Sequence, residues 1–203
     1  MDITRYINLS FLATLLLVFG ILINQYNASK IVWHHSEAEA MESLLQIYQA
    51  EWQWHNSDID NNSVKDFWVR DVAGLFFYNR PQTGKSIKLI PKDIAVADMN
   101  PFFEFYRGNH FEKLPYKGYY FKMATYDENG MYQAKKDIAT NIAYCDSKFC
   151  VIAYPAFNKK LRTFIVNSDK KIIFRKIASI TEADKWPADV EKEGWEEFVL
   201  ELH

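Results

Sequence analysis

Cys145 and Cys150 are the only two cysteines in the chain, and their spacing allows two kinds of chemistry. A disulfide between them would close a short loop, which removes only about 2 to 3 kcal/mol of unfolded-state entropy. Two free thiols are the alternative. The separation and orientation of the two cysteines decide between a disulfide and free thiols, and the sequence does not give that geometry. Zinc needs four ligands, which two cysteines without nearby histidines do not supply. We favour a disulfide that pins the start of a strand, and we expect no metal.

Carboxylates, serines and histidines are present, but none of them stands in a catalytic motif. No nucleophile elbow, phosphate-binding P-loop or dinucleotide fingerprint occurs in the sequence. Residues 127–130 (DENG) lack the later ligands of a calcium loop and predict a hairpin turn instead. His34 and His35 would point about 100° apart on a helix, so they cannot share one ligand face. We therefore expect no catalytic residue, no cofactor and no enzymatic activity.

An aromatic string in a loop-rich stretch is the best candidate for a binding surface. Loops are where binding residues tend to lie, and contact with a partner or a glycan is one explanation of the string. Packing over a sheet is the simpler explanation, and we favour it. The residues of this candidate partner surface are Phe102, Phe103, Phe105, Tyr106, Phe111 and Tyr116.

The overall composition excludes two classes of protein. The 203 residues carry 24 Lys and Arg against 26 Asp and Glu, and this balance argues against a nucleic-acid or other polyanion binder. Hydrophobic residues make up 49% of the chain and aromatic residues 16%, which is far too apolar for a disordered chain. The basic pairs of the second half are typical of lysines that guard solvated strand edges.

The N-terminal segment is predicted to anchor the chain in a membrane. No charged side chain lies between Arg5 and Lys30, and as a helix this stretch would measure about 36 Å, enough to cross a bilayer core of about 30 Å. A cleaved secretory signal is the alternative, but Tyr26 or Asn27 would stand where cleavage needs a small residue. We therefore expect an uncleaved anchor at residues 1–29, in contact with lipid through residues 6–29.

Beyond the anchor, apolar residues recur at helical spacing. Met41, Leu44, Leu45, Tyr48 and Trp52 form one stripe, and no glycine or proline interrupts the run through His55. The polar residues 56–63 then end the predicted helix. The anchor and this amphipathic helix are therefore expected to be nearly continuous.

The rest of the chain reads as helical pieces followed by strands. Residues 66–78 fit either a short helix or a strand, and residues 91–99 predict a short helix opened by Pro91. Strands are predicted at residues 119–124, 149–154, 162–166 and 172–176, with a polar turn at residues 167–170 between the last two. The expected fold class is α+β, with the long N-terminal helix packed on a small antiparallel sheet in one domain, residues 30–203.

This architecture, together with local strings, resembles the type IV pilins and pseudopilins. Residues 66–75 (DFWVRDVAGL), 118–121 (GYYF), 154–156 (YPA) and 162–167 (RTFIVN) are similar to motifs of a group of bacterial, membrane-anchored, pilin-like proteins. The resemblance covers roughly residues 36–198 and implies no catalytic residues. One departure concerns processing, because prepilins carry a Gly followed by an aromatic residue or Met and a Glu soon after. Here Gly20 is followed by Ile21, and the first glutamate is Glu37.

The expected function is that of a non-enzymatic, single-pass envelope protein that acts as an assembly or interaction component. Its N-terminus would lie in the cytoplasm, its anchor in the bacterial inner membrane, and its domain in the periplasm or outside the cell. Other pilin-like or envelope proteins would be its partners. The alternative is an anchored domain that binds a glycan or peptide, or hydrolyses it with groups such as Glu104 and Asp127. Hydrolysis would need two carboxylates about 5 to 10 Å apart in an aromatic cleft.

Overall fold

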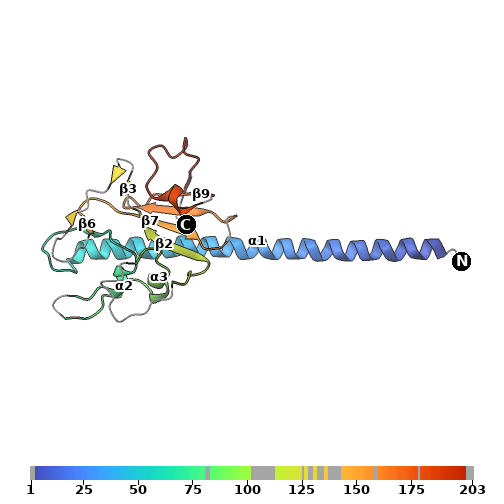
Figure 1. The fold of residues 1–203 in the computed structure, drawn as a ribbon, viewed down its shortest axis with the longest axis horizontal. Coiled ribbons are helices and arrows are strands. Elements are labelled where there is room, and N and C mark those ends of the chain that lie inside the picture. Colours follow the sequence, from blue (N-terminus) through green and yellow to red (C-terminus); the bar gives the residue numbers. More distant parts are fainter. Residues whose placement is uncertain are drawn as a thin grey trace. The chain divides into compact units, whose positions relative to one another are not determined.

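The computed structural model describes residues 3–80, 83–101, 113–124, 126–127, 130–131, 135–136, 143–157, 160–177 and 179–199. Figure 1 shows their course from the N-terminal helix to the C-terminal strands. The chain divides into two compact units, Met1–Glu37 and Ala38–His203.

A single α-helix, α1, runs from Ile3 to Ser57 without a break (Figure 1). It contains no proline, and its one glycine, Gly20, is tolerated inside a helix at a cost of about 1 kcal/mol. The predicted helix through His55 is therefore confirmed. The polar residues beyond it form a turn, in which Asp58 has a φ of 43° and its carboxylate accepts the N–H of Ser63 at 3.2 Å.

Within the described part of the chain, no helix combines the length and the apolar character that crossing a membrane requires. Most side chains of the predicted anchor, residues 1–29, lie outside the described residues. The anchor therefore stays a prediction.

The buried face of α1 is rotated from the predicted stripe. Leu44 is fully buried as predicted, but Met41, Leu45, Tyr48 and Trp52 are only partly buried. The most buried apolar positions of the helix within the second unit are Ala40, Leu44, Ile47, Ala50 and Trp54. The physical reason is that Trp54 packs against the rings of Trp68 and Tyr78. The helix is therefore covered on the Trp54 side as well as on the side that faces the sheet.

Five antiparallel strands form the main sheet, in the order β10-β9-β8-β7-β2. They are β2 (Tyr119–Met123), β7 (Cys150–Pro155), β8 (Thr163–Asn167), β9 (Ile172–Arg175) and β10 (Glu196–Phe198). The first four confirm the predicted strands. The sequence does not predict β10, because its two exposed glutamates and one phenylalanine show no apolar alternation.

The turn between β8 and β9 confirms the polar turn predicted from the sequence. The Asn167 Oδ1 atom accepts the backbone N–H of Asp169 at 3.1 Å and that of Lys171 at 3.0 Å. Lys170 takes a left-handed backbone, with a φ of 62°. One short polar side chain therefore closes the hairpin by replacing backbone acceptors.

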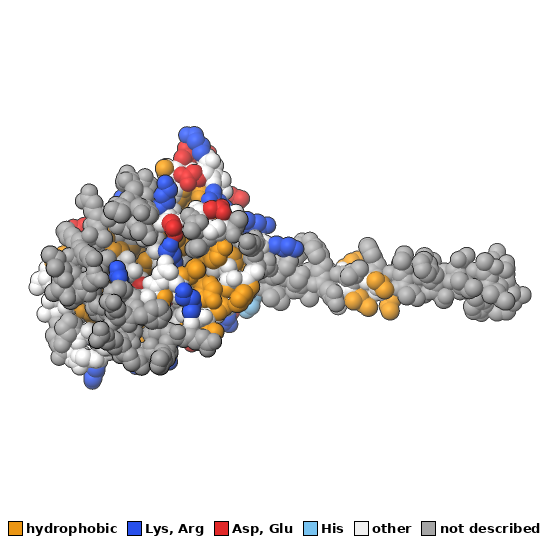
Figure 2. All heavy atoms as spheres, viewed as in Figure 1, with side chains coloured by type: hydrophobic (Ala, Val, Ile, Leu, Met, Phe, Trp, Pro, Cys, Tyr) orange, Lys and Arg blue, Asp and Glu red, His pale blue; other side chains and the backbone are white. Residues whose placement is uncertain are grey.

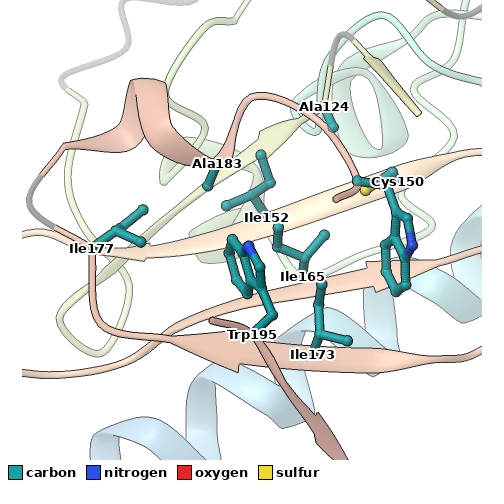
Figure 3. Close-up of a cluster of buried hydrophobic side chains, with 9 residues drawn as sticks. Ala124, Cys150, Ile152, Ile165, Ile173, Ile177, Ala183 and Trp195 are labelled. Carbon is teal, nitrogen blue, oxygen red and sulfur yellow. The ribbon is translucent and has the colours of Figure 1, made fainter. Parts of the chain in front are cut away.

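One face of the main sheet carries a row of isoleucines. Ile152, Ile165 and Ile173 are direct neighbours on β7, β8 and β9. They pack with Trp195 and with the 3-10 helix η2, Ile180–Ala183, through Ala183. Figure 3 shows these side chains meeting above the strands. The C-terminal segment therefore covers this face.

Alternate residues of the same strands point to the opposite face, as the pleat requires. Val151, Ala153 and Phe164 are 0% exposed there, so this face is buried too. Figure 3 shows α1 on that side of the sheet. The Tyr48 ring of α1 lies 5.8 Å from the ring of Phe149, directly before β7. The sheet is therefore the middle layer of the Ala38–His203 unit.

Short elements complete the described part of the second unit. Residues 66–78, whose sequence fits either a short helix or a strand, contain one of each, β1 and α2. The remaining elements are β1 (Phe67–Trp68), α2 (Gly74–Phe77), α3 (Lys92–Val96), β3 (Tyr126–Asp127), β4 (Gly130–Met131), β5 (Lys135–Lys136) and β6 (Ala143–Cys145). Strands β1, β6 and β5 form a second sheet in that order, and β3 and β4 form the hairpin predicted at residues 127–130. The fold class is α+β, with one long helix and an antiparallel five-stranded sheet.

Candidate functional site

A cluster of buried carboxylates surrounds the segment that joins β1 to α2. Glu51 and Asp98 are 0% exposed, Asp71 is 2% exposed and Asp66 is 5% exposed. Ionisable groups are rarely buried to this extent, and such groups are often found at functional sites. The cluster is therefore the first candidate site of the domain.

Trp68 lies at the centre of the cluster. Its backbone N–H donates to the Glu51 Oε2 atom of α1 at 3.0 Å. Its indole Nε1–H donates to the backbone oxygen of Asp71 at 2.7 Å and contacts the Asp71 Oδ1 atom at 3.2 Å. Its ring lies 5.0 Å from the ring of Trp54 and 5.3 Å from that of Tyr78. One side chain thus connects α1 to the start of α2.

Gly74 makes this arrangement possible. A Cβ atom at position 74 would lie 2.3 Å from atoms of the Trp68 indole, so only glycine fits. The Asp71 Oδ1 atom accepts the Gly74 N–H at 2.9 Å and so caps the first turn of α2. The string of residues 66–75 is therefore a packing motif. The Trp68 ring leaves room only for glycine at position 74, and the Asp71 carboxylate accepts N–H groups from both residues.

Asp98 shares the cluster with a second carboxylate. Its Oδ2 atom accepts the Ala73 N–H at 2.8 Å, and its Oδ1 atom accepts the Asn100 N–H at 2.8 Å. Burial, and next the nearby carboxylate of Asp71, raise the pKa of Asp98 to about 7. The Asp71–Asp98 pair therefore holds a proton at a pH where exposed carboxylates are ionised.

Glu51 and Asp66 are perturbed in the same direction. Burial raises the pKa of Glu51 well above its usual value of 4.5, and the hydrogen bond from Trp68 opposes this shift. The Glu51 Oε1 atom is buried without a hydrogen-bond partner in the described part of the chain. Burial also raises the pKa of Asp66, against the hydrogen bond that its Oδ2 atom accepts from Asn62. Glu51, Asp66 and Asp98 therefore all favour their protonated forms more than exposed carboxyls do.

The acid cluster does not form a metal centre. Among the described residues, no group of three or more His, Cys, Asp or Glu side chains could hold a metal ion. The carboxylate oxygens that have partners accept backbone and indole N–H groups or, at Asp66, the side-chain amide of Asn62. We read the cluster as the structural junction between α1 and the domain, and its raised pKa values as a source of pH-dependent stability.

A cavity of about 270 Å³ lies at the edge of the main sheet. Its apolar wall includes Trp186 and Val190, and its polar rim includes Asp169, Lys171 and Glu197. Trp186 gives the cavity one aromatic wall, and most of the remaining lining is polar. The sequence does not predict this cavity, because it is lined by three separate segments, residues 167–173, residues 186–190 and Glu197, which only the fold brings together.

The two cysteines are not joined by a disulfide in the structure, and each is 3% exposed. Cys145 ends β6, where its sulfur lies 3.7 Å from the Ser147 Oγ atom. Cys150 starts β7 and belongs to the apolar cluster of the main sheet. The disulfide remains a prediction.

Most of the predicted aromatic surface lies outside the described residues. That part comprises Phe102, Phe103, Phe105, Tyr106 and Phe111, and Glu104 lies outside as well. Tyr116 is described, and it is partly buried and bridges to Tyr119. The side chains of Asp127 and His34 are not among those described. The predicted partner surface therefore stays a prediction.

Sequence reasoning misses the acid cluster almost entirely. Glu51 stands between apolar neighbours on a predicted helix, where a glutamate is usually exposed. Asp98 precedes a predicted loop and carries no signal of its own. The one available signal is the string around Trp68, whose closely spaced aromatic, acidic and glycine residues do not show what they contact.

No protein-family model, curated protein or solved structure matches the chain.

Proposed function

We propose that the chain is a non-enzymatic, single-pass envelope protein whose domain serves as an interaction or assembly component of the pilin-like type. One observation carries the proposal: the uncharged residues 6–29 and the helix that is tied into the domain core belong to one unbroken helix, α1. Within the second unit, the Trp68 N–H donates to the Glu51 Oε2 atom and so ties this helix into the domain.

The apolar side chains of the first unit support a contact with lipid or with neighbouring helices. Leu17 is 67% exposed, Ile21 is 50% exposed and Ile23 is 47% exposed. Large apolar side chains that the chain itself does not cover are typical of membrane or protein contacts. In this proposal, residues 6–29 cross the bacterial inner membrane, and the Ala38–His203 unit lies on its outer side.

Membrane extraction tests the anchor directly. We expect the full chain to stay in the membrane pellet after alkaline carbonate washing. Val18→Arg combined with Ile21→Arg places two charges in the predicted span and is expected to release the chain into the supernatant. Val64→Arg is the matched control, because Val64 is 45% exposed and belongs to the other unit. Release of the unaltered chain would contradict the anchor.

Crosslinking in native membranes tests the assembly role. We expect the full chain to recover envelope proteins through its helix, and the double-arginine variant to lose them. Recovery of no protein by either chain would contradict the assembly role, even if the anchor holds.

The cavity at the sheet edge favours a second candidate function, an anchored binding module. Trp186 offers an apolar wall, and Lys171 and Glu197 offer one charge of each sign at the rim. Such a site suits a small glycan or a short peptide. Isothermal titration of the full chain with chitooligosaccharides and with muropeptides tests this function, with Lys171→Ala and Glu197→Ala expected to weaken any binding. Heats of mixing that match the buffer control would reject it.

A further inference from the structure

The strand β10 forms a free edge of the main sheet. Within the described part of the chain, β10 ends the strand order and pairs only with β9. The opposite edge strand, β2, is covered by the segment after α3. The Phe121 N–H donates to the Ala97 oxygen at 2.9 Å, and the Met99 N–H donates to the Phe121 oxygen at 2.7 Å. The two edges therefore differ, and β10 is the edge that another strand can join.

The hydrogen-bond pattern of the sheet identifies the backbone groups that β10 directs outward. Bonded and non-bonded residue pairs alternate along antiparallel strands. The Asn167 N–H donates to the Lys171 oxygen at 3.2 Å, so the next bonded pair between β8 and β9 lies two residues further on, at Ile173. The residues on either side of Ile173 then bond to their partners in β10. The N–H and C=O groups of Glu197, the partner of Ile173, therefore point away from the sheet.

The Glu197 side chain lies beside the cavity of about 270 Å³. Glu197 pairs directly with Ile173, and directly paired residues share one face of a sheet. Both residues line the cavity, which is also lined by Trp186 and Val190. Glu197 thus contributes its backbone to the free edge and its side chain to the cavity rim. A strand that joined β10 would place the side chain opposite Glu197 at this rim.

The charges on β10 favour a basic segment as the partner. Both charged residues of the strand, Glu196 and Glu197, are acidic and exposed. Figure 2 shows charged side chains of both signs over the C-terminal segment. In that segment Lys192 pairs with Asp189 at 2.7 Å, but Glu197 makes no ion pair with any described residue. The lysine of the cavity rim, Lys171, lies in the turn before β9 and not on the edge strand. A lysine or arginine directly opposite a glutamate is a favourable cross-strand pair.

The same charges disfavour pairing between two copies of β10. Of the three residues of this strand, only Glu197 directs its backbone groups outward. Two antiparallel copies would therefore bond through Glu197 of each chain, and the two glutamates would lie directly opposite each other. Like charges in that position destabilise a strand pair. A basic segment carries no such penalty, so β10 fits a basic partner strand better than it fits itself.

We propose that β10 and the cavity together bind an extended peptide segment with a central lysine or arginine, which adds to the main sheet as a further strand. The central residue exchanges hydrogen bonds with the N–H and C=O of Glu197, and its cationic side chain pairs with the Glu197 carboxylate beside Trp186. An apolar residue two positions away meets Val199, which is 75% exposed. This inference rests on the second candidate of the proposed function, the binding module, and names its ligand as an extended basic peptide.

Fluorescence anisotropy of a labelled heptapeptide, titrated with the full chain in detergent micelles, tests the proposal. The peptide has threonine at its odd positions, valine at the second and sixth, and arginine at the fourth, so the arginine and the valines share one face. We expect saturable binding that weakens at least about threefold when glutamate replaces the arginine. Equal affinities of the two peptides for the unaltered chain would reject a basic ligand.

A charge reversal on the protein assigns this preference to one residue. Glu197→Lys is expected to reverse the preference, so that the glutamate peptide binds more tightly than the arginine peptide. Glu42→Lys is the matched control, because it makes the same change of charge at an exposed residue of α1 that does not line the cavity. This control is expected to leave the preference unchanged. A preference that Glu197→Lys leaves unchanged would show that the peptide does not pair with this residue.

Peptides with one N-methyl group test the backbone pairing separately from the charge. A methyl group on the arginine nitrogen removes the N–H that donates to the Glu197 oxygen, and we expect it to weaken binding about tenfold or more. A methyl group on the nitrogen of the following threonine replaces an N–H that points away from β10, and we expect a much smaller effect. Equal effects of the two methyl groups would reject strand addition.

The binding module and the strand addition fail in distinguishable ways. If the heptapeptide does not bind but a chitooligosaccharide or a muropeptide does, the cavity is a binding site and strand addition is wrong. If none of them binds, the binding module fails as well. If the heptapeptide does not bind and Glu197→Cys crosslinks two copies of the chain, the edge pairs with itself. The unaltered chain is the control for crosslinking, because Cys145 and Cys150 are buried.

Discussion

A Cβ atom at Gly74 would lie 2.3 Å from the indole of Trp68, so these two residues fix each other's identity. The same indole donates to Asp71, whose carboxylate caps the turn that begins at Gly74. Trp68, Asp71 and Gly74 are thereby held together, and the Trp68 backbone N–H connects them to Glu51 of α1. The relationship explains how a long helix is attached to the domain without a disulfide or metal at this junction.

Replacement of Gly74 by alanine is expected to destabilise the domain by about 1 to 3 kcal/mol, because the indole of Trp68 must move to admit a methyl group. Urea unfolding followed by tryptophan fluorescence measures the change. Gly20→Ala is the matched control, because nothing lies within 4 Å of a Cβ at that helical position. Equal stability of Gly74→Ala and the unaltered chain would show that the contact is not tight.

The raised pKa of Asp98 predicts that stability falls as the pH rises. Because the folded pKa of about 7 lies above the ordinary value of 3.8, the folded state holds the proton more tightly than the unfolded state between these values. The stabilisation is full below the ordinary value and is lost as the pH rises to about 7, with a slope of at most about 1.4 kcal/mol per pH unit for one proton.

Asp98→Asn tests this slope, because an amide cannot titrate. The free energy of unfolding of the two chains is measured across the same pH window, and their difference removes the contribution of other groups. The variant is expected to be less stable at acidic pH, where it loses a good acceptor for one N–H, and to show a flatter profile. Parallel profiles for the two chains would assign the pH dependence elsewhere.

Substitutions of Glu51 separate the role of its charge from that of its hydrogen bond. Glu51→Gln keeps an acceptor for the Trp68 N–H and removes the buried carboxyl, whose Oε1 atom has no partner in the described part of the chain. We expect Glu51→Gln to equal or exceed the stability of the unaltered chain near neutral pH. Glu51→Ala leaves the Trp68 N–H unpaired and is expected to cost about 1 to 3 kcal/mol. Thermal unfolding distinguishes the two, and equal losses would show that packing, not the hydrogen bond, matters there.

The sequence is a good guide to α1 and to four strands of the main sheet, because helical and β-branched patterns are local. It is a poor guide to residues 66–78, since the tertiary contact between Trp68 and Gly74 divides that segment into a strand and a helical turn. It also misses the burial of Glu51, because only a residue seventeen positions away supplies the N–H that makes burial possible. The periodicity of apolar residues shows that an element has a buried face. Which residues form that face depends on tertiary contacts, which the sequence does not reveal.

The β8–β9 turn offers a prediction of increased stability. Lys170 has a φ of 62°, a left-handed backbone that costs a residue with a Cβ about 1 kcal/mol or more and costs glycine almost nothing. Lys170→Gly is therefore expected to raise the free energy of unfolding by up to about 1 kcal/mol, although the added freedom of glycine in the unfolded chain offsets part of the gain. Lys171→Gly is the matched control, since position 171 has no positive φ, and it is expected to lower stability. Equal losses of stability for both glycine variants in urea unfolding would contradict this prediction. The Asn167 side chain, and not the left-handed residue, would then set the shape of the turn. In that case Asn167→Ala should open the turn at a cost of about 1 kcal/mol, because two hydrogen bonds are lost.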